Sequence, residues 1–157
     1  MSPPDQSKII LDINLFLSDP DKKNKTIVFT NGCFDLLHNG HLHLIKEAKK
    51  EGDHLIVGIN DDASVKRLKG ETRPVENIEK RMLHLAQLKE VDFIIPFSED
   101  TPLLLIEKIK PAVLVKGGDY IENEIVGADF VKSNGGKVVL VPLLKGFSTT
   151  KSIRFSK

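Results

Sequence analysis

Short apolar runs alternate with amphipathic segments over most of the chain. Runs rich in Val and Ile predict β-strands at 26–30, 54–59, 92–96, 112–116 and 137–142. Between them, apolar residues at helical spacing predict helices at 40–51, 78–89, 102–109 and about 124–134, with a last helix near 149–155. Because the strands are nearly continuous in apolar residues and alternate with helices, we expect an α/β fold. Its doubly wound, five-stranded parallel sheet would carry helices on both faces.

The first residues form an extension ahead of this alternation. Ile9, Ile10 and Ile13 lie at helical spacing with Phe16, and Pro20 follows shortly after the end of that run. This pattern predicts one helix, which either packs on the outside of the domain or binds a partner. The chain shows no internal repeat and no second boundary, so we expect an extension at 1–25 and one domain at 26–157.

Composition narrows the class of protein. A net charge of +1 over 157 residues provides no general attraction to nucleic acid or to anionic membranes. No apolar run approaches the ~20 residues that span a bilayer, and no signal-peptide pattern opens the chain. Cys33 is the single cysteine, which excludes a disulfide framework and a Cys-rich zinc site. We expect a cytoplasmic protein that binds neither nucleic acid nor membrane.

Two histidines give the sharpest chemical signal. His38 and His41 follow the first strand and open the next helix, with Gly40 between them. Backbone N–H groups at a helix N-terminus attract anions, and glycine permits close approach of a ligand to the backbone. The pair therefore indicates a phosphate site, in which the imidazoles donate hydrogen bonds. Two other interpretations remain open: simple helix capping, and metal binding, although no zinc-site spacing surrounds the pair.

A cationic segment follows the second strand. Lys66, Arg67, Lys69 and Arg73 fall on a predicted loop that is punctuated by Gly70 and a proline. Such a string is either a solvated charged surface or a flexible lid that closes over the outer phosphates of a nucleotide. Spacing alone leaves open which of the two lysines would contact those phosphates.

Other polar groups also follow predicted strands, at the edge where ligands bind in open α/β sheets. Gly117 and Gly118 form either an ordinary turn or a backbone approach to a nucleoside. Ser148 begins a hydroxyl cluster that either caps the last helix or holds a second phosphate. Arg81 either binds the phosphate of a second substrate or pairs with Glu79 or Glu90. Cys33 fits a small buried residue better than a nucleophile.

The motifs resemble a known family. The run from Thr30 to His41, with its His-Asn-Gly-His ending, and the late Ser148-Thr149-Thr150 are similar to the cytidylyltransferase-like nucleotidyltransferases. Segments 61–70, 73–75, 99–102 and 114–120 resemble more specifically the D-glycero-D-manno-heptose 1-phosphate adenylyltransferases, over about residues 26–153. The resemblance implies a Rossmann-like fold and an enzyme of ADP-heptose synthesis, for lipopolysaccharide or other heptose-containing glycans.

The resemblance also implies roles for individual residues. His38 and His41 would stabilise the transition state at the α-phosphate of ATP, and Lys66 or Lys69 would neutralise the outer phosphates. Asp35, Arg73 and Arg81 are the candidates for the second substrate. The candidate nucleotide-binding residues are Thr30, Asn31, Gly32, Phe34, Asp35, Gly40, Lys116, Gly117, Gly118, Asp119, Ser148, Thr149 and Thr150.

The implied substrates are ATP and a sugar 1-phosphate, with Mg²⁺ as the assisting ion and no metal held by protein ligands alone. A homo-oligomer, in particular a dimer, is expected. The first alternative is a relative that uses another acceptor, such as a glycerol-3-phosphate cytidylyltransferase. The second is a metal-dependent phosphohydrolase built on the two histidines with Asp61 or Asp62. The third is a catalytically silent nucleotide sensor.

Overall fold

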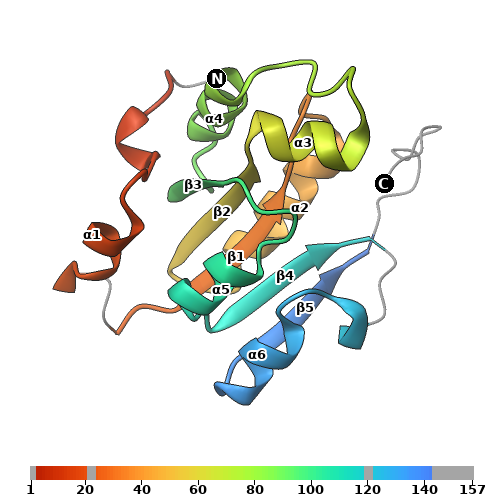
Figure 1. The fold of residues 1–157 in the computed structure, drawn as a ribbon. Coiled ribbons are helices and arrows are strands. Elements are labelled where there is room, and N and C mark those ends of the chain that lie inside the picture. Colours follow the sequence, from red (N-terminus) through yellow and green to blue (C-terminus); the bar gives the residue numbers. More distant parts are fainter. Residues whose placement is uncertain (1–2, 21–23, 119–121, 143–157) are drawn as a thin grey trace.

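The computed structural model describes residues 3–20, 24–118 and 122–142 and shows one five-stranded sheet (Figure 1). The strands are β1 (Ile27–Gly32), β2 (His54–Asn60), β3 (Phe93–Phe97), β4 (Val113–Gly117) and β5 (Lys137–Val141). Their order is β3-β2-β1-β4-β5, and every neighbouring pair is parallel. The predicted strands are confirmed, with each end shifted by two residues or fewer.

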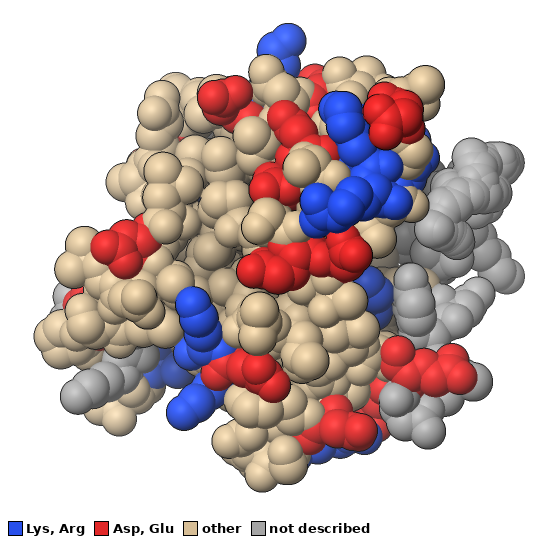
Figure 2. All heavy atoms as spheres, in the orientation of Figure 1, with Lys and Arg blue, Asp and Glu red and all other residues tan. Residues whose placement is uncertain are grey.

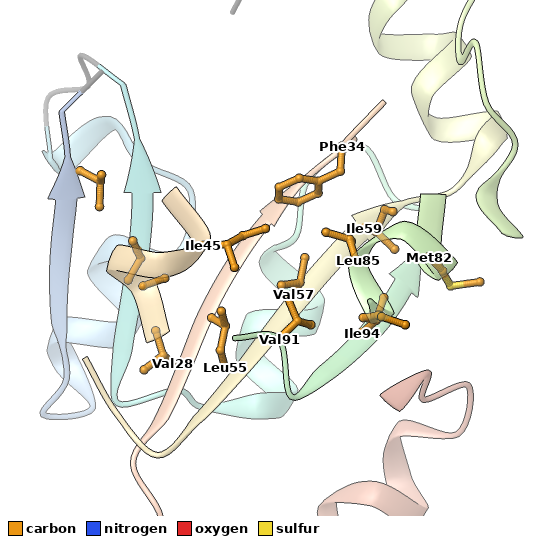
Figure 3. Packing of buried hydrophobic residues seen from close by; sticks show 14 of the residues in the cluster. Val28, Phe34, Ile45, Leu55, Val57, Ile59, Met82, Leu85, Val91 and Ile94 are labelled. Atoms are coloured by element: carbon orange, nitrogen blue, oxygen red, sulfur yellow. The ribbon is translucent and has the colours of Figure 1, made fainter. Parts of the chain in front are cut away.

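Helices cover both faces of the sheet, as predicted. Helices α2 (Asn39–Lys49) and α4 (Ile78–Ala86) bury Ile45 and Leu85 against one face, in the cluster drawn in Figure 3. Helices α5 (Leu103–Ile109) and α6 (Ala128–Ser133) bury Ile106 and Val131 against the other face. Side chains of β1 alternate between the two cores, because Val28 belongs to the first and Phe29 to the second.

The cationic segment after β2 differs from the prediction. Helix α3 (Asp62–Lys69) includes Lys66 and Lys69, which had been predicted to lie on a loop. Asp61 caps this helix by accepting a hydrogen bond from the Ser64 N–H, and Val65 is buried beneath it. The loop begins only at Gly70. The predicted helix at 124–134 is also shorter, because α6 begins only at Ala128, after the 3₁₀ turn η3 (Glu122–Glu124) and Gly127, whose φ is 89°. The helix predicted near 149–155 lies outside the described residues.

The N-terminal segment packs against the edge strand β3. It forms a 3₁₀ turn, η1 (Gln6–Lys8), and a short helix, α1 (Ile13–Leu17), where a single helix was predicted. Ile9 makes a parallel bridge with Ile94, and the Ile10 N–H donates to the Ile94 carbonyl at 2.8 Å. Phe16 is buried, with its ring 4.7 Å from that of Phe93. Of the two predicted alternatives, the structure therefore shows the N-terminal segment packed on the outside of the domain.

Candidate functional site

The strands β1 and β4 separate toward their carboxyl ends. They are paired only at Val28–Val113 and Phe29–Leu114, although β1 continues to Gly32 and β4 to Gly117. On its other side, β1 remains paired with β2 as far as Gly32. The strand order reverses between β1 and β4, and in open α/β sheets this is the point where ligands bind. Thr30 lies where the two strands separate, and its fully buried hydroxyl has no hydrogen-bond partner among the described residues.

A strained arch follows β1. Phe34 and Leu36 have φ values of 50° and 63°, in the left-handed region that side chains disfavour by about 1–2 kcal/mol each. The arch directs Asp35 inward, where its carboxylate accepts hydrogen bonds from the Val75 and Glu76 N–H groups at 2.7 and 3.0 Å. It also accepts from Arg73 Nε at 3.1 Å. Burial of the carboxylate raises its pKa, but these hydrogen bonds outweigh burial, so the pKa of Asp35 lies below its usual value.

The two histidines hold each other at the start of α2. His38 is the N-cap residue, and its Nδ1 accepts from the Gly40 N–H at 3.1 Å. His41 Nδ1 accepts in turn from the His38 N–H at 3.3 Å, and the rings stack with centroids 3.8 Å apart. A Cβ at position 40 would lie 2.9 Å from His38 Cε1, so glycine is needed for this packing. The capping interpretation and the phosphate interpretation are compatible, because capping occupies only Nδ1.

Both rings are neutral donors near pH 7. Burial lowers the pKa of His38, and burial with the charges of His38 and Lys69 lowers the pKa of His41 to about 4. A neutral imidazole whose Nδ1 accepts a hydrogen bond carries its proton on Nε2. Each histidine can therefore present an Nε2–H donor to an anion without first losing or gaining a proton.

Lys69 is the α3 lysine that acts on this region. Its charge acts on Cys33, which follows β1, on His41 of α2 and on Lys116 of β4, and in each case it favours a lower pKa. Burial is the largest cause of the lowered Lys116 pKa and raises that of the Cys33 thiol. Cys33 is therefore a poor nucleophile, as expected. Lys and Arg side chains gather over α3 in Figure 2, where Arg67 also pairs with Asp100 at 2.9 Å.

Arg81 connects the ends of β1 and β2 from within the protein. Its fully buried guanidinium donates to the carbonyls of Cys33 and Asn60 at 2.9 and 2.7 Å, and to that of Glu76 at 2.9 Å. Its ion-pair partner is Asp62 at 2.6 Å, so the expected pairing with Glu79 or Glu90 is wrong. The sequence signalled a cation here but gave no indication of this network.

The structure brings the glycines and the predicted strand ends to the same edge of the sheet. Gly32 ends β1, Gly117 ends β4, and Gly118 has a φ of 106°, which glycine adopts without strain. Asn31 lies near the end of β1, Phe34 in the connection from β1 to α2, and Gly40 in the first turn of α2. Asp119, Ser148, Thr149 and Thr150 lie outside the described residues, so their predicted roles stay predictions.

The donor set does not fit a metal centre held by the protein alone. No group of three or more His, Cys, Asp or Glu side chains in the described ranges could hold a metal ion. Asp61 caps α3 and Asp62 pairs with Arg81, which commits both carboxylates to the fold. A separate pocket of about 350 Å³ lies between the N-terminal segment, β3 and α5. Of the residues considered above for a site, only Asp61 lines it. No helix in the described ranges is long and apolar enough to cross a membrane.

This arrangement, with two histidine donors at the switch point of a five-stranded parallel sheet, agrees with the family comparison. The chain belongs to the cytidylyltransferase-like family, whose model matches residues 29–151.

Individual relatives give a more specific likeness. The chain is 56% identical over 128 residues to the bifunctional protein HldE of Gluconobacter oxydans, covering 82% of this chain and 27% of that protein. It is 51% identical over 148 residues to the HldE of Helicobacter hepaticus, covering 94% of this chain and 30% of that protein. The second match necessarily includes part of residues 1–25, so the similarity extends beyond 26–153. The chain spans about three tenths of the length of these curated relatives.

A solved structure gives the same result at the level of the fold. The lipopolysaccharide core biosynthesis protein of Thermoplasma volcanium is 31% identical, with a TM-score of 0.63, over 78% of this chain and 98% of that one. The pantoate–β-alanine ligase of Francisella tularensis has a TM-score of 0.62 at 24% identity, over 87% of this chain and 67% of that one, which shows a shared fold only.

Proposed function

We propose that the chain transfers AMP from ATP to D-glycero-D-manno-heptose 1-phosphate, giving ADP-heptose and pyrophosphate for lipopolysaccharide or other heptose-containing glycans. The observation that carries the proposal is the stacked His38–His41 pair at the N-terminus of α2, with both Nδ1 atoms occupied. Family membership supports nucleotidyl transfer. The similarity to HldE proteins and to a lipopolysaccharide core biosynthesis protein supports the choice of acceptor.

The reaction is a displacement at phosphorus with no change in oxidation state. A phosphate oxygen of the sugar phosphate forms a bond to the α-phosphorus of ATP. The bond from that phosphorus to the α–β bridging oxygen breaks, and its electron pair leaves with pyrophosphate. The acceptor phosphate is already an anion at pH 7, so the enzyme needs no strong general base. It must instead position two anions and offset their repulsion.

The site residues fit this demand. The Nε2–H groups of His38 and His41 would bind the α-phosphate oxygens as charge develops there. Lys69 would neutralise the outer phosphates, because its charge acts at both His41 and Lys116. The neighbouring backbone at Gly118 would admit the nucleoside. Mg²⁺ would be held mainly by the phosphates of ATP, since the described carboxylates form no cluster for it.

The decisive assay measures pyrophosphate release for ATP and CTP, each with heptose 1-phosphate and with glycerol 3-phosphate. We expect release only with ATP and heptose 1-phosphate. His41→Ala should lower kcat by roughly 10²–10³-fold because it removes one transition-state donor. His43→Ala, on the same helix but outside the site, is the matched control. Normal turnover in His41→Ala would refute the proposed role of the histidines.

The same assay separates the alternatives. A preference for CTP and glycerol 3-phosphate would identify a cytidylyltransferase with another acceptor. Release of inorganic phosphate from ATP without an acceptor would identify a phosphohydrolase, and nucleotide binding without turnover would identify a sensor. We also infer a cytoplasmic enzyme that works as a homodimer without nucleic acid. Fractionation would test its location, light scattering its oligomeric state, and the absorbance ratio of the purified protein the absence of nucleic acid.

A further inference from the structure

The loop between α3 and α4 carries an arginine that is held at one end only. Arg73 donates through Nε to the buried Asp35 carboxylate at 3.1 Å, and its side chain is 37% exposed. Its two terminal nitrogens make no hydrogen bond with any residue in the described ranges. The guanidinium is therefore fixed in place while its outer fork of N–H groups remains available. Such a fork matches the oxygens of a phosphate group.

The attachment to Asp35 is strong. The carboxylate that holds Arg73 also accepts from the Val75 and Glu76 N–H groups, and its side chain is only 1% exposed. The strained φ values of Phe34 and Leu36 on either side direct Asp35 to this position. Because Asp35 lies in the connection from β1 to α2, the network fixes Arg73 relative to the strand end and to the histidine-bearing helix.

Arg73 and Lys69 both act electrostatically on Cys33 but differ in the other groups they act on. Arg73 acts electrostatically on Cys33 and Asp35, whereas Lys69 acts on Cys33, His41 and Lys116. In a displacement at phosphorus, the entering and leaving oxygens lie roughly in line on opposite sides of the reacting atom. A site for this reaction needs one cationic group for each side. Lys69 acts on His41 and fits the triphosphate, whereas Arg73 is hydrogen-bonded to Asp35 and is left for the acceptor.

We propose that Arg73 binds the phosphate of the acceptor, a small phosphomonoester, and that Asp35 is the positioning residue that aims it. This inference rests on the proposed function, because it assigns one half of that two-substrate site. Arg81, the other arginine considered for this role, uses its donors inside the protein and supports the strand ends.

The test compares Arg73→Gln and Arg73→Lys with Arg67→Gln, a matched control on the neighbouring helix whose arginine pairs with Asp100. Steady-state kinetics should give a KM for heptose 1-phosphate that rises roughly 10–100-fold in Arg73→Gln, with the KM for ATP changed less than about twofold. Arg73→Lys should recover part of this loss, because it restores the charge but not the fork. Asp35→Asn should raise the acceptor KM in the same selective way, and Tm values verify that each variant is folded.

Calorimetric binding of heptose 1-phosphate to the folded proteins, without ATP, separates this inference from the proposed function. Weaker binding in Arg73→Gln supports the acceptor site even if no nucleotide is turned over. An unchanged acceptor affinity and KM would overturn it, and so would an equal rise in both KM values or a rise for ATP alone. If the wild-type protein bound heptose 1-phosphate through Arg73 but showed no turnover, the proposed reaction would be refuted and the acceptor site would stand.

Discussion

The lowered pKa of His41 predicts that the protein loses stability in mild acid. Burial, together with the charges of His38 and Lys69, lowers the pKa of His41 from 6.5 to about 4 in the folded protein. In the unfolded chain a histidine titrates near 6.5. As the pH falls below that value, the unfolded chain takes up the proton first, so the contribution of His41 to stability is complete above pH 6.5. It is then lost progressively down to about pH 4.

The magnitude follows from the two pKa values. Each pH unit between them corresponds to about 1.4 kcal/mol. The whole interval therefore amounts to about 3 kcal/mol, and at pH 5 roughly 2 kcal/mol of it has been lost. This loss is large against the 5–15 kcal/mol typical of folded domains. It should therefore lower the urea midpoint clearly.

Urea unfolding of the wild type and of His41→Gln at pH 7.5, 6.5, 5.5 and 5.0 measures the effect. The variant lacks this titrating ring, so its free energy of unfolding should fall by roughly 2 kcal/mol less than that of the wild type over this range. His43→Gln, which keeps His41, should follow the wild-type slope. Parallel curves for the wild type and His41→Gln would show that the ring is not held neutral by its surroundings.

Two further variants test the framework of the site. Arg81→Met leaves three strand-end and loop carbonyls and Asp62 without their donor, and it should lower the free energy of unfolding by about 3–5 kcal/mol in urea at pH 7.5. A loss below about 1 kcal/mol would contradict this account. Lys69→Ala should raise the KM for ATP by about 10-fold, and Lys66→Ala should have little effect. A larger rise in the KM for ATP in Lys66→Ala than in Lys69→Ala would show that Lys66, and not Lys69, contacts the phosphates.

Much of the fold follows from the sequence because local pattern and burial agree. Each buried strand is a compact apolar run, and helix caps such as Asn77 are readable from residue type. Helix α3 was not predicted from the sequence. Its exposed face is densely charged, and Val65 and Leu68 alone give too short an apolar pattern at helical spacing. Strand order and the separation of β1 from β4 depend on how the helices pack, and no local pattern encodes them.

In the candidate site, too, local features could be predicted from the sequence, whereas contacts between distant residues could not. His38, Gly40 and His41 could be proposed from the sequence because their chemistry depends on neighbours within one turn of helix. The Arg81 network and the attachment of Arg73 to Asp35 link residues about 20 to 50 positions apart, which spacing cannot reveal. The proposed preference for Lys69 over Lys66 also required the fold, because it rests on the charge of Lys69 acting at His41 and Lys116.

The bridge from Ile9 to Ile94 also bears on where this domain can be cut. A truncated protein that starts at β1 would expose the outer backbone of β3 to solvent. It would also expose Phe93, whose ring contacts Phe16. An unprotected sheet margin of this kind recruits strands from other molecules. The short N-terminal segment thus guards the sheet against self-association, and its removal would threaten solubility before it touched any catalytic group.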